Sequence, residues 1–103
     1  MPKLRKFDTT KFTFHLKGKK GPIYFANVPG QETYIKNRVD RLYIKEPETI
    51  KWIDKFEKDS TFFDIGANIG IYTLYSAIAR GNTVYAFEPH SASYKNLLDS
   101  INL

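Results

Sequence analysis

Two stretches, TFFDIGANIG at residues 61–70 and TVYAFEP at residues 83–89, decide the fold of this 103-residue chain. The first is an apolar run that ends in a glycine-containing turn, and the second is an apolar run that ends in a lone carboxylate, Glu88. Gly66 and Glu88 are 22 residues apart, close to the ~20 residues that separate a nucleotide-binding glycine turn from the acid that holds a ribose. The pair therefore predicts a strand–turn–helix–strand unit that binds a nucleoside.

The residues around these stretches predict alternating helices and strands. A helix is expected over residues 70–80, where Gly81 provides the stop, and another begins after Ser91, which is a suitable N-cap. Their inward-facing stripes would be Ile71, Leu74, Tyr75 and Ile78 in the first, and Tyr94, Leu97, Leu98 and Ile101 in the second. This alternation predicts an α/β fold, the front half of a Rossmann-like doubly wound parallel sheet.

The apolar residues of the first strand shape the expected core. Residues 61–65 show no alternation before Asp64, which is typical of a strand buried on both faces of a parallel sheet. Trp52 and the phenylalanines are likewise interpreted as core residues rather than as a stacking platform. Right-handed crossovers would bring the carboxyl ends of both strands to one edge, where ligands bind in such folds.

The chain upstream divides at residue 45. Residues 1–45 are predicted to form a basic arm, a β-hairpin from residues 11–17 and 23–27, and a short helix carrying Ile35, Val39 and Leu42. Residues 46–103 would form the partial Rossmann-like domain, which begins with a lead-in helix after Pro47. The chain is thus interpreted as truncated before the back half of that domain.

Composition narrows the class of protein. Residues 1–20 carry seven Lys and Arg against one Asp, whereas residues 61–103 carry two against three acids, so the positive charge lies away from the candidate site. The chain has no cysteine, which excludes a disulfide framework and a thiolate metal site.

We expect a cytoplasmic location. We expect no nucleic-acid partner, because no recognised motif accompanies the basic arm. Asp64 argues against a membrane span in the apolar window around it.

The candidate site combines residues that can hold a nucleoside. Gly66 permits a sharp turn where a side chain would block a ligand, and Gly70 lets the following helix start close to the strand. Glu88 can accept hydrogen bonds from two adjacent ribose hydroxyls. Ala67 and Asn68 stand where a dinucleotide fingerprint requires a second glycine for its pyrophosphate.

S-adenosylmethionine suits these residues better than a dinucleotide does. This cofactor has no pyrophosphate, and its amino acid end needs polar partners, which Asp64 and Asn68 can supply. No His, Asp or Glu set with metal-ligand spacing is present. His15 and His90 are interpreted as surface residues.

FDIGANIGIYTL followed by VYAFEP resembles the FkbM-type family of S-adenosylmethionine-dependent methyltransferases, and the preceding EPETIKWIDKF resembles that family's lead-in helix. The resemblance implies a Rossmann-like fold and methyl transfer to a hydroxyl group of a saccharide or another small molecule. It also implies that Asp64, Gly66, Asn68 and Gly70 surround the methionine end of the cofactor and that Glu88 holds the ribose. The family's later segments, with any catalytic base, would lie beyond Leu103.

Two alternatives remain open. An NAD-binding oxidoreductase half-domain fits the spacing of turn and acid, although the missing second glycine argues against it. Alternatively, the chain is a non-catalytic remnant or interaction module. We expect the isolated chain to be inactive, marginally stable and prone to association, because the strand over residues 61–65 would be unpaired on one side.

Overall fold

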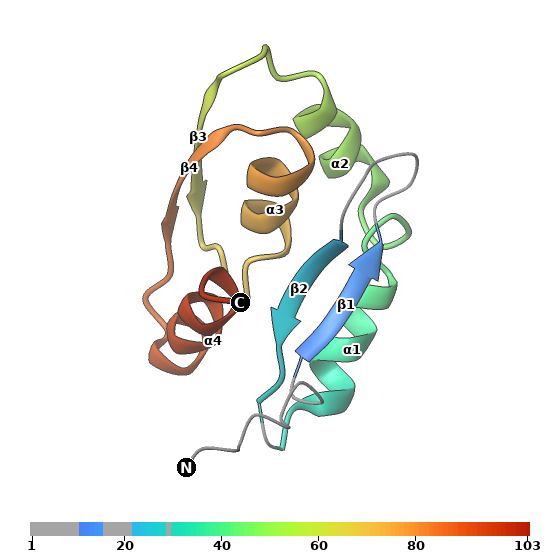
Figure 1. Ribbon diagram of the computed structural model, residues 1–103, viewed down its shortest axis with the longest axis vertical. Coiled ribbons are helices and arrows are strands. Elements are labelled where there is room, and N and C mark those ends of the chain that lie inside the picture. Colours follow the sequence, from blue (N-terminus) through green and yellow to red (C-terminus); the bar gives the residue numbers. More distant parts are fainter. Residues whose placement is uncertain (1–10, 16–21, 29) are drawn as a thin grey trace.

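The computed structural model describes residues 11–15, 22–28 and 30–103 (Figure 1). The predicted basic arm at residues 1–10 and most of the predicted hairpin turn lie outside these ranges. Two strands, β1 (Lys11–His15) and β2 (Pro22–Ala26), pair antiparallel and confirm the predicted hairpin. Two further strands, β3 (Thr61–Ile65) and β4 (Thr83–Phe87), pair parallel, with Thr61 opposite Thr83. The α/β class is therefore confirmed.

Helices α1 (Glu32–Asp40) and α2 (Pro47–Asp54) follow the hairpin, as the sequence predicts. They share one apolar core with the hairpin and with the segment after β3. Its buried members are Ile23, Phe25, Ile35, Val39, Leu42, Ile50, Ile53, Ile69, Ile71, Leu74 and Tyr75. Because these residues run from β2 to the helix that follows β3, one interior joins the hairpin to the segment between β3 and β4. Within the described ranges, no helix has the length and apolar character needed to cross a membrane.

The helix between β3 and β4 changes its winding part of the way along. It begins as α3 (Ile71–Leu74) and continues as a π-helical segment, η2 (Tyr75–Ala79), before Gly81 ends it with φ +70°. A π-helix bonds each N–H five residues back, so its turns are wider than those of an α-helix. Ile78 therefore leaves the predicted inward stripe and is 52% exposed, which corrects the expectation from the sequence.

Helix α4 (Ser91–Ile101) buries a face that the sequence did not predict. His90, not Ser91, is the N-cap residue. Of the predicted inward stripe only Leu97 is buried, whereas Tyr94, Leu98 and Ile101 are exposed.

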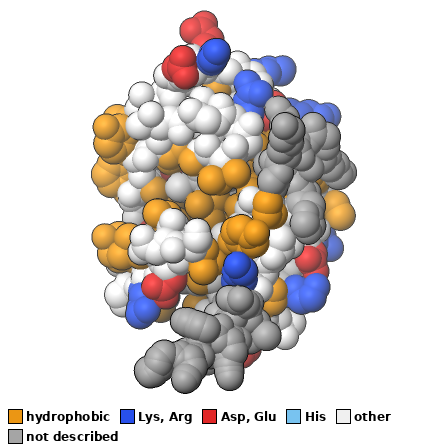
Figure 2. Space-filling model, viewed as in Figure 1, with side chains coloured by type: hydrophobic (Ala, Val, Ile, Leu, Met, Phe, Trp, Pro, Cys, Tyr) orange, Lys and Arg blue, Asp and Glu red, His pale blue; other side chains and the backbone are white. Residues whose placement is uncertain are grey.

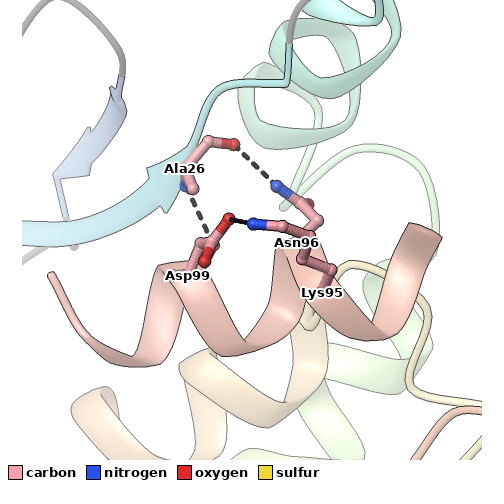
Figure 3. A network of polar contacts seen from close by, with 5 residues as sticks. Ala26, Lys95, Asn96 and Asp99 are labelled. Atoms are coloured by element: carbon pink, nitrogen blue, oxygen red, sulfur yellow. Dashed lines mark hydrogen bonds and ion pairs between the residues drawn. The ribbon is translucent and has the colours of Figure 1, made fainter. Parts of the chain in front are cut away.

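The buried face of α4 packs against the free side of β2, and its polar residues satisfy the strand's backbone (Figure 3). The Ala26 N–H donates to Ser100 Oγ at 2.8 Å, and Asn96 Nδ2 donates to the Ala26 carbonyl at 3.0 Å. Buried backbone groups must be paired, so polar side chains occupy this face in place of the apolar stripe.

The outer face of the β3–β4 sheet is uncovered by any described element. The expectation that β3 is buried on both faces is wrong, because Ile65 is 74% exposed and Phe63, Tyr85 and Phe87 are also exposed beside it. Trp52 on α2 is exposed too, contrary to the core interpretation. In Figure 2 hydrophobic side chains gather along the side of the molecule on which β3 and β4 lie. Within the described residues β3 pairs with β4 alone.

Candidate functional site

The turns that follow β3 and β4 meet at the carboxyl edge of the sheet. Gly66 has φ +78°, a backbone angle that favours glycine. The N–H groups of Gly66 and Ala67 donate to the carbonyl of Phe87 at 2.8 and 3.0 Å. The chain leaving β3 therefore crosses to the end of β4, as the parallel arrangement predicts.

Glu88 joins the two turns through its carboxylate. The Asn68 N–H donates to Glu88 Oε1 at 2.6 Å, and the His90 N–H donates to Oε2 at 3.0 Å. These bonds, from His90 first and then from Asn68, lower the pKa of Glu88 below its usual value, so the group is ionised at neutral pH. A carboxylate offers about four acceptor positions. Each Glu88 oxygen thus keeps capacity for a hydroxyl donor.

The two glycines of the predicted loop, Gly66 and Gly70, have different surroundings. Gly70 has φ +95°, and a Cβ there would lie 2.4 Å from Leu97 Cδ1. A Cβ on Gly66 would meet nothing within 4 Å. Gly70 therefore permits close contact with α4, while Gly66 borders open space where a ligand has room. The side chain of Ala67 is buried beneath the turn.

Asp64 points toward the helix and away from the open edge. It is buried and accepts a hydrogen bond from Thr73 Oγ1 at 2.6 Å. Tyr72 donates to Glu46 Oε1 at 2.6 Å, and burial followed by the Glu46 carboxylate raises the pKa of Tyr72 to about 12. Asp64, Thr73 and Tyr72 thus hold α3 in place, whereas Gly66, Asn68 and Glu88 come together at the edge.

A cleft of about 730 Å³ opens beside Asn68 and His90. Its lining residues are Gly30, Gln31, Glu32, Thr33, Tyr34, Asn68, His90 and Ser93. One wall comes from residues 30–34, at the start of α1, and the other from the turns after β3 and β4. Asn68 Nδ2 donates to the Tyr34 hydroxyl at 3.4 Å and so joins the walls.

The sequence interpretation missed the α1 wall. Residues 28–30 carry only a Pro-Gly break, and no periodic pattern connects residues 30–34 with Asn68. The one available signal was an aromatic residue, Tyr34, lying off the apolar stripe of α1. Such a signal places the ring on the surface but does not place it at the site.

The described lining of the cleft is negatively charged. It includes the carboxylate of Glu32, which accepts the Gly30 N–H at 3.0 Å, and no Lys or Arg is among these described residues. His90 Nδ1 lies 3.1 Å from Ser93 Oγ at the start of α4. With Glu88 at its edge, this surface favours a cationic or neutral ligand over a phosphorylated one. No group of three or more metal-ligating side chains occurs in the described part of the chain.

Comparison of the chain with protein-family models, with curated proteins and with solved structures gave no match.

Proposed function

We propose that this chain is part of an S-adenosylmethionine-dependent methyltransferase of the FkbM type, built on the front half of a Rossmann-like sheet. The observation that carries the proposal is the meeting of the Gly66–Asn68 turn with Glu88 at the carboxyl edge of two parallel strands. Ligands bind at this edge in open α/β sheets. The ~20-residue spacing of turn and acid is that of a ribose-binding pair.

The residues at this edge suit the cofactor. Gly66 leaves open space for its approach, and the ionised Glu88 has free acceptor capacity for two ribose hydroxyls. When bound, S-adenosylmethionine supplies a methyl group for transfer from sulfur to an acceptor oxygen of a saccharide or other small molecule. The role of this chain is to hold and orient the cofactor for that in-line transfer. We assign no catalytic base to the described residues.

The charge of the cleft favours this cofactor over NAD. A dinucleotide brings a pyrophosphate, which needs close backbone approach and positive or dipolar partners. Here Asn68 stands in place of the second glycine, and the described lining of the cleft has the carboxylate of Glu32 and no Lys or Arg. S-adenosylmethionine has no pyrophosphate, so this surface does not repel it as it would repel a dinucleotide. A second possibility within this proposal is a non-catalytic remnant or half-site, which binds the cofactor but does not transfer its methyl group.

Calorimetry with S-adenosylhomocysteine on the 103-residue chain tests the proposal. We expect saturable binding that Glu88→Gln weakens about 10- to 100-fold, because a charged acceptor of two hydroxyl donors is lost. Glu57→Gln serves as the matched control, since Glu57 is exposed and lies away from the cleft. Thermal melting of each variant shows whether the turn has kept its fold.

Two results would contradict the proposal. One is the absence of S-adenosylhomocysteine binding by the folded chain. The other is binding that Glu88→Gln leaves unchanged. Tight binding of NADH by the same chain would favour the oxidoreductase alternative instead.

A further inference from the structure

The residues that hold Glu88 also line the cleft. Asn68 and His90 donate their N–H groups to the two Glu88 oxygens, and both contribute to the cleft wall. Glu88 is not itself a lining residue but adjoins the cleft through these two residues. A ribose held by Glu88 would therefore lie beside the cleft, and the base attached to it would extend either into the cleft, toward the α1 wall at residues 30–34, or away from it.

Among the described residues that line the cleft, Tyr34 is the one Phe, Tyr or Trp. The residue is 47% exposed, and its side chain has contacts on two sides. Its hydroxyl accepts a hydrogen bond from Asn68 Nδ2, and the guanidinium carbon of Arg38 lies 5.9 Å from its ring centroid. A fixed, exposed aromatic ring is a suitable surface for stacking a nucleobase.

We infer that the α1 wall is the adenine subsite of this protein, with Tyr34 as the residue on which the base stacks. The inference rests on the proposed function and names the part of the cofactor that the cleft takes. The ligand class is an adenosine without phosphate groups.

Three of the other described lining residues, Gln31, Thr33 and Ser93, are neutral hydrogen-bonding residues, which suit the polar edge of a purine. Glu32 adds a negative charge to the wall. No Lys or Arg is among the described lining residues, which disfavours a nucleotide phosphate. A volume of about 730 Å³ lies within the range of small-molecule sites, and it exceeds the needs of a single base, so part of the ribose can enter as well.

Titration of the ¹⁵N-labelled 103-residue chain, followed by NMR, tests the inference with three probes: S-adenosylhomocysteine, adenosine and methionine. We expect the amides of residues 31–34 to shift with the first two probes and not with methionine. Tyr34→Ala should weaken binding of both adenosine-containing probes by roughly 5- to 100-fold. Tyr34→Phe keeps the ring and should retain most of the affinity.

Tyr94→Ala is the matched control. Tyr94 is also 47% exposed and also lies on a helix, but it does not line the cleft. This variant should bind as the wild type does. The shifts of the wild-type chain are an independent readout, so the test does not depend on the folding of any variant.

The outcomes separate this inference from the proposed function. If S-adenosylhomocysteine binds and depends on Glu88, but residues 31–34 do not shift and Tyr34→Ala binds normally, the adenine assignment is wrong and the function stands. If methionine shifts residues 31–34, the wall takes the other end of the cofactor, and the assignment is again wrong. If S-adenosylhomocysteine does not bind at all, both are overturned.

Discussion

At Gly70 the turn after β3 lies against Leu97 of α4. The backbone of Gly70 is in the left-handed region, and the place of its missing Cβ is taken by the side chain of Leu97, which is itself 2% exposed. Glycine is therefore favoured at position 70 for two reasons: the left-handed backbone angle and the lack of space for a Cβ atom. Gly81 offers a comparison, because it has a left-handed φ of +70° but nothing lies within 4 Å of its Cβ position.

Gly70→Ala should lower the free energy of unfolding by about 2–4 kcal/mol, the sum of a left-handed backbone penalty and overpacking. Gly81→Ala should cost only about 1–2 kcal/mol, since it carries the backbone penalty alone. Denaturant unfolding monitored by circular dichroism measures both values. If both variants lose the same free energy of unfolding, the side chain of Leu97 moves aside without an energetic cost, and the overpacking argument is wrong. Leu97→Ala should cost less stability in the Gly70→Ala background than in the wild type, because it also relieves the overpacking.

At the scale of elements, α4 shows how a neighbour selects which side of a helix is buried. The helix offers an apolar stripe with Tyr94 and Leu98, yet the structure buries Asn96 and Ser100. These polar residues meet the backbone of β2 at Ala26. The same helix carries an exposed ion pair, Lys95–Asp99 at 3.0 Å, which can be seen in Figure 3.

Ser100→Ala should lower the free energy of unfolding by about 1–3 kcal/mol, because it leaves the buried Ala26 N–H without an acceptor. Asp99→Ala, the control one residue away, removes an exposed i, i+4 ion pair and should cost less than about 0.5 kcal/mol. Thermal and denaturant unfolding compare the two. If both variants lose the same small amount, water satisfies the Ala26 N–H and the polar face of α4 is not needed.

The elements also show how far the sequence alone could lead. The β3–turn–β4 unit could be predicted because Gly66 and Glu88 are separated by a short, characteristic spacing, and because helices and strands alternate along this part of the sequence. The buried side of α4 could not, since helical periodicity identifies stripes but does not say which neighbour each stripe meets. Tyr34 could not be assigned to the site either, because its contact with Asn68 joins segments 34 residues apart.

At the scale of the whole molecule, the uncovered face of the β3–β4 sheet is an unusual feature for a parallel sheet, which is ordinarily buried on both sides. The exposed side chains there are Phe63, Ile65, Tyr85 and Phe87. Together they leave roughly 400–500 Å² of apolar surface open. A face-to-face pair of two copies would cover about 900 Å², which is in the range of weak protein–protein interfaces.

The chain should therefore associate weakly with itself, in a concentration-dependent manner. Ile65→Lys should shift the equilibrium toward the monomer in sedimentation velocity, since it places a charge on this face at its most exposed side chain. Ile44→Lys is the control, because Ile44 is 64% exposed and lies between α1 and α2, away from the sheet face. A wild-type chain that remains monomeric at millimolar concentration would contradict this expectation.

The pairing of Ala26 with α4 also provides a built-in reporter of motion. Ala26 and Ser100 are 74 residues apart in a chain of 103, so the contact closes most of the chain into a loop, here called the ring. The cleft walls, the start of α1 and the start of α4, lie within that ring. In hydrogen–deuterium exchange, the amide of Ala26 can exchange only when Ser100 moves away. The lifetime of that one amide proton therefore measures how often the carboxyl end of α4 leaves β2.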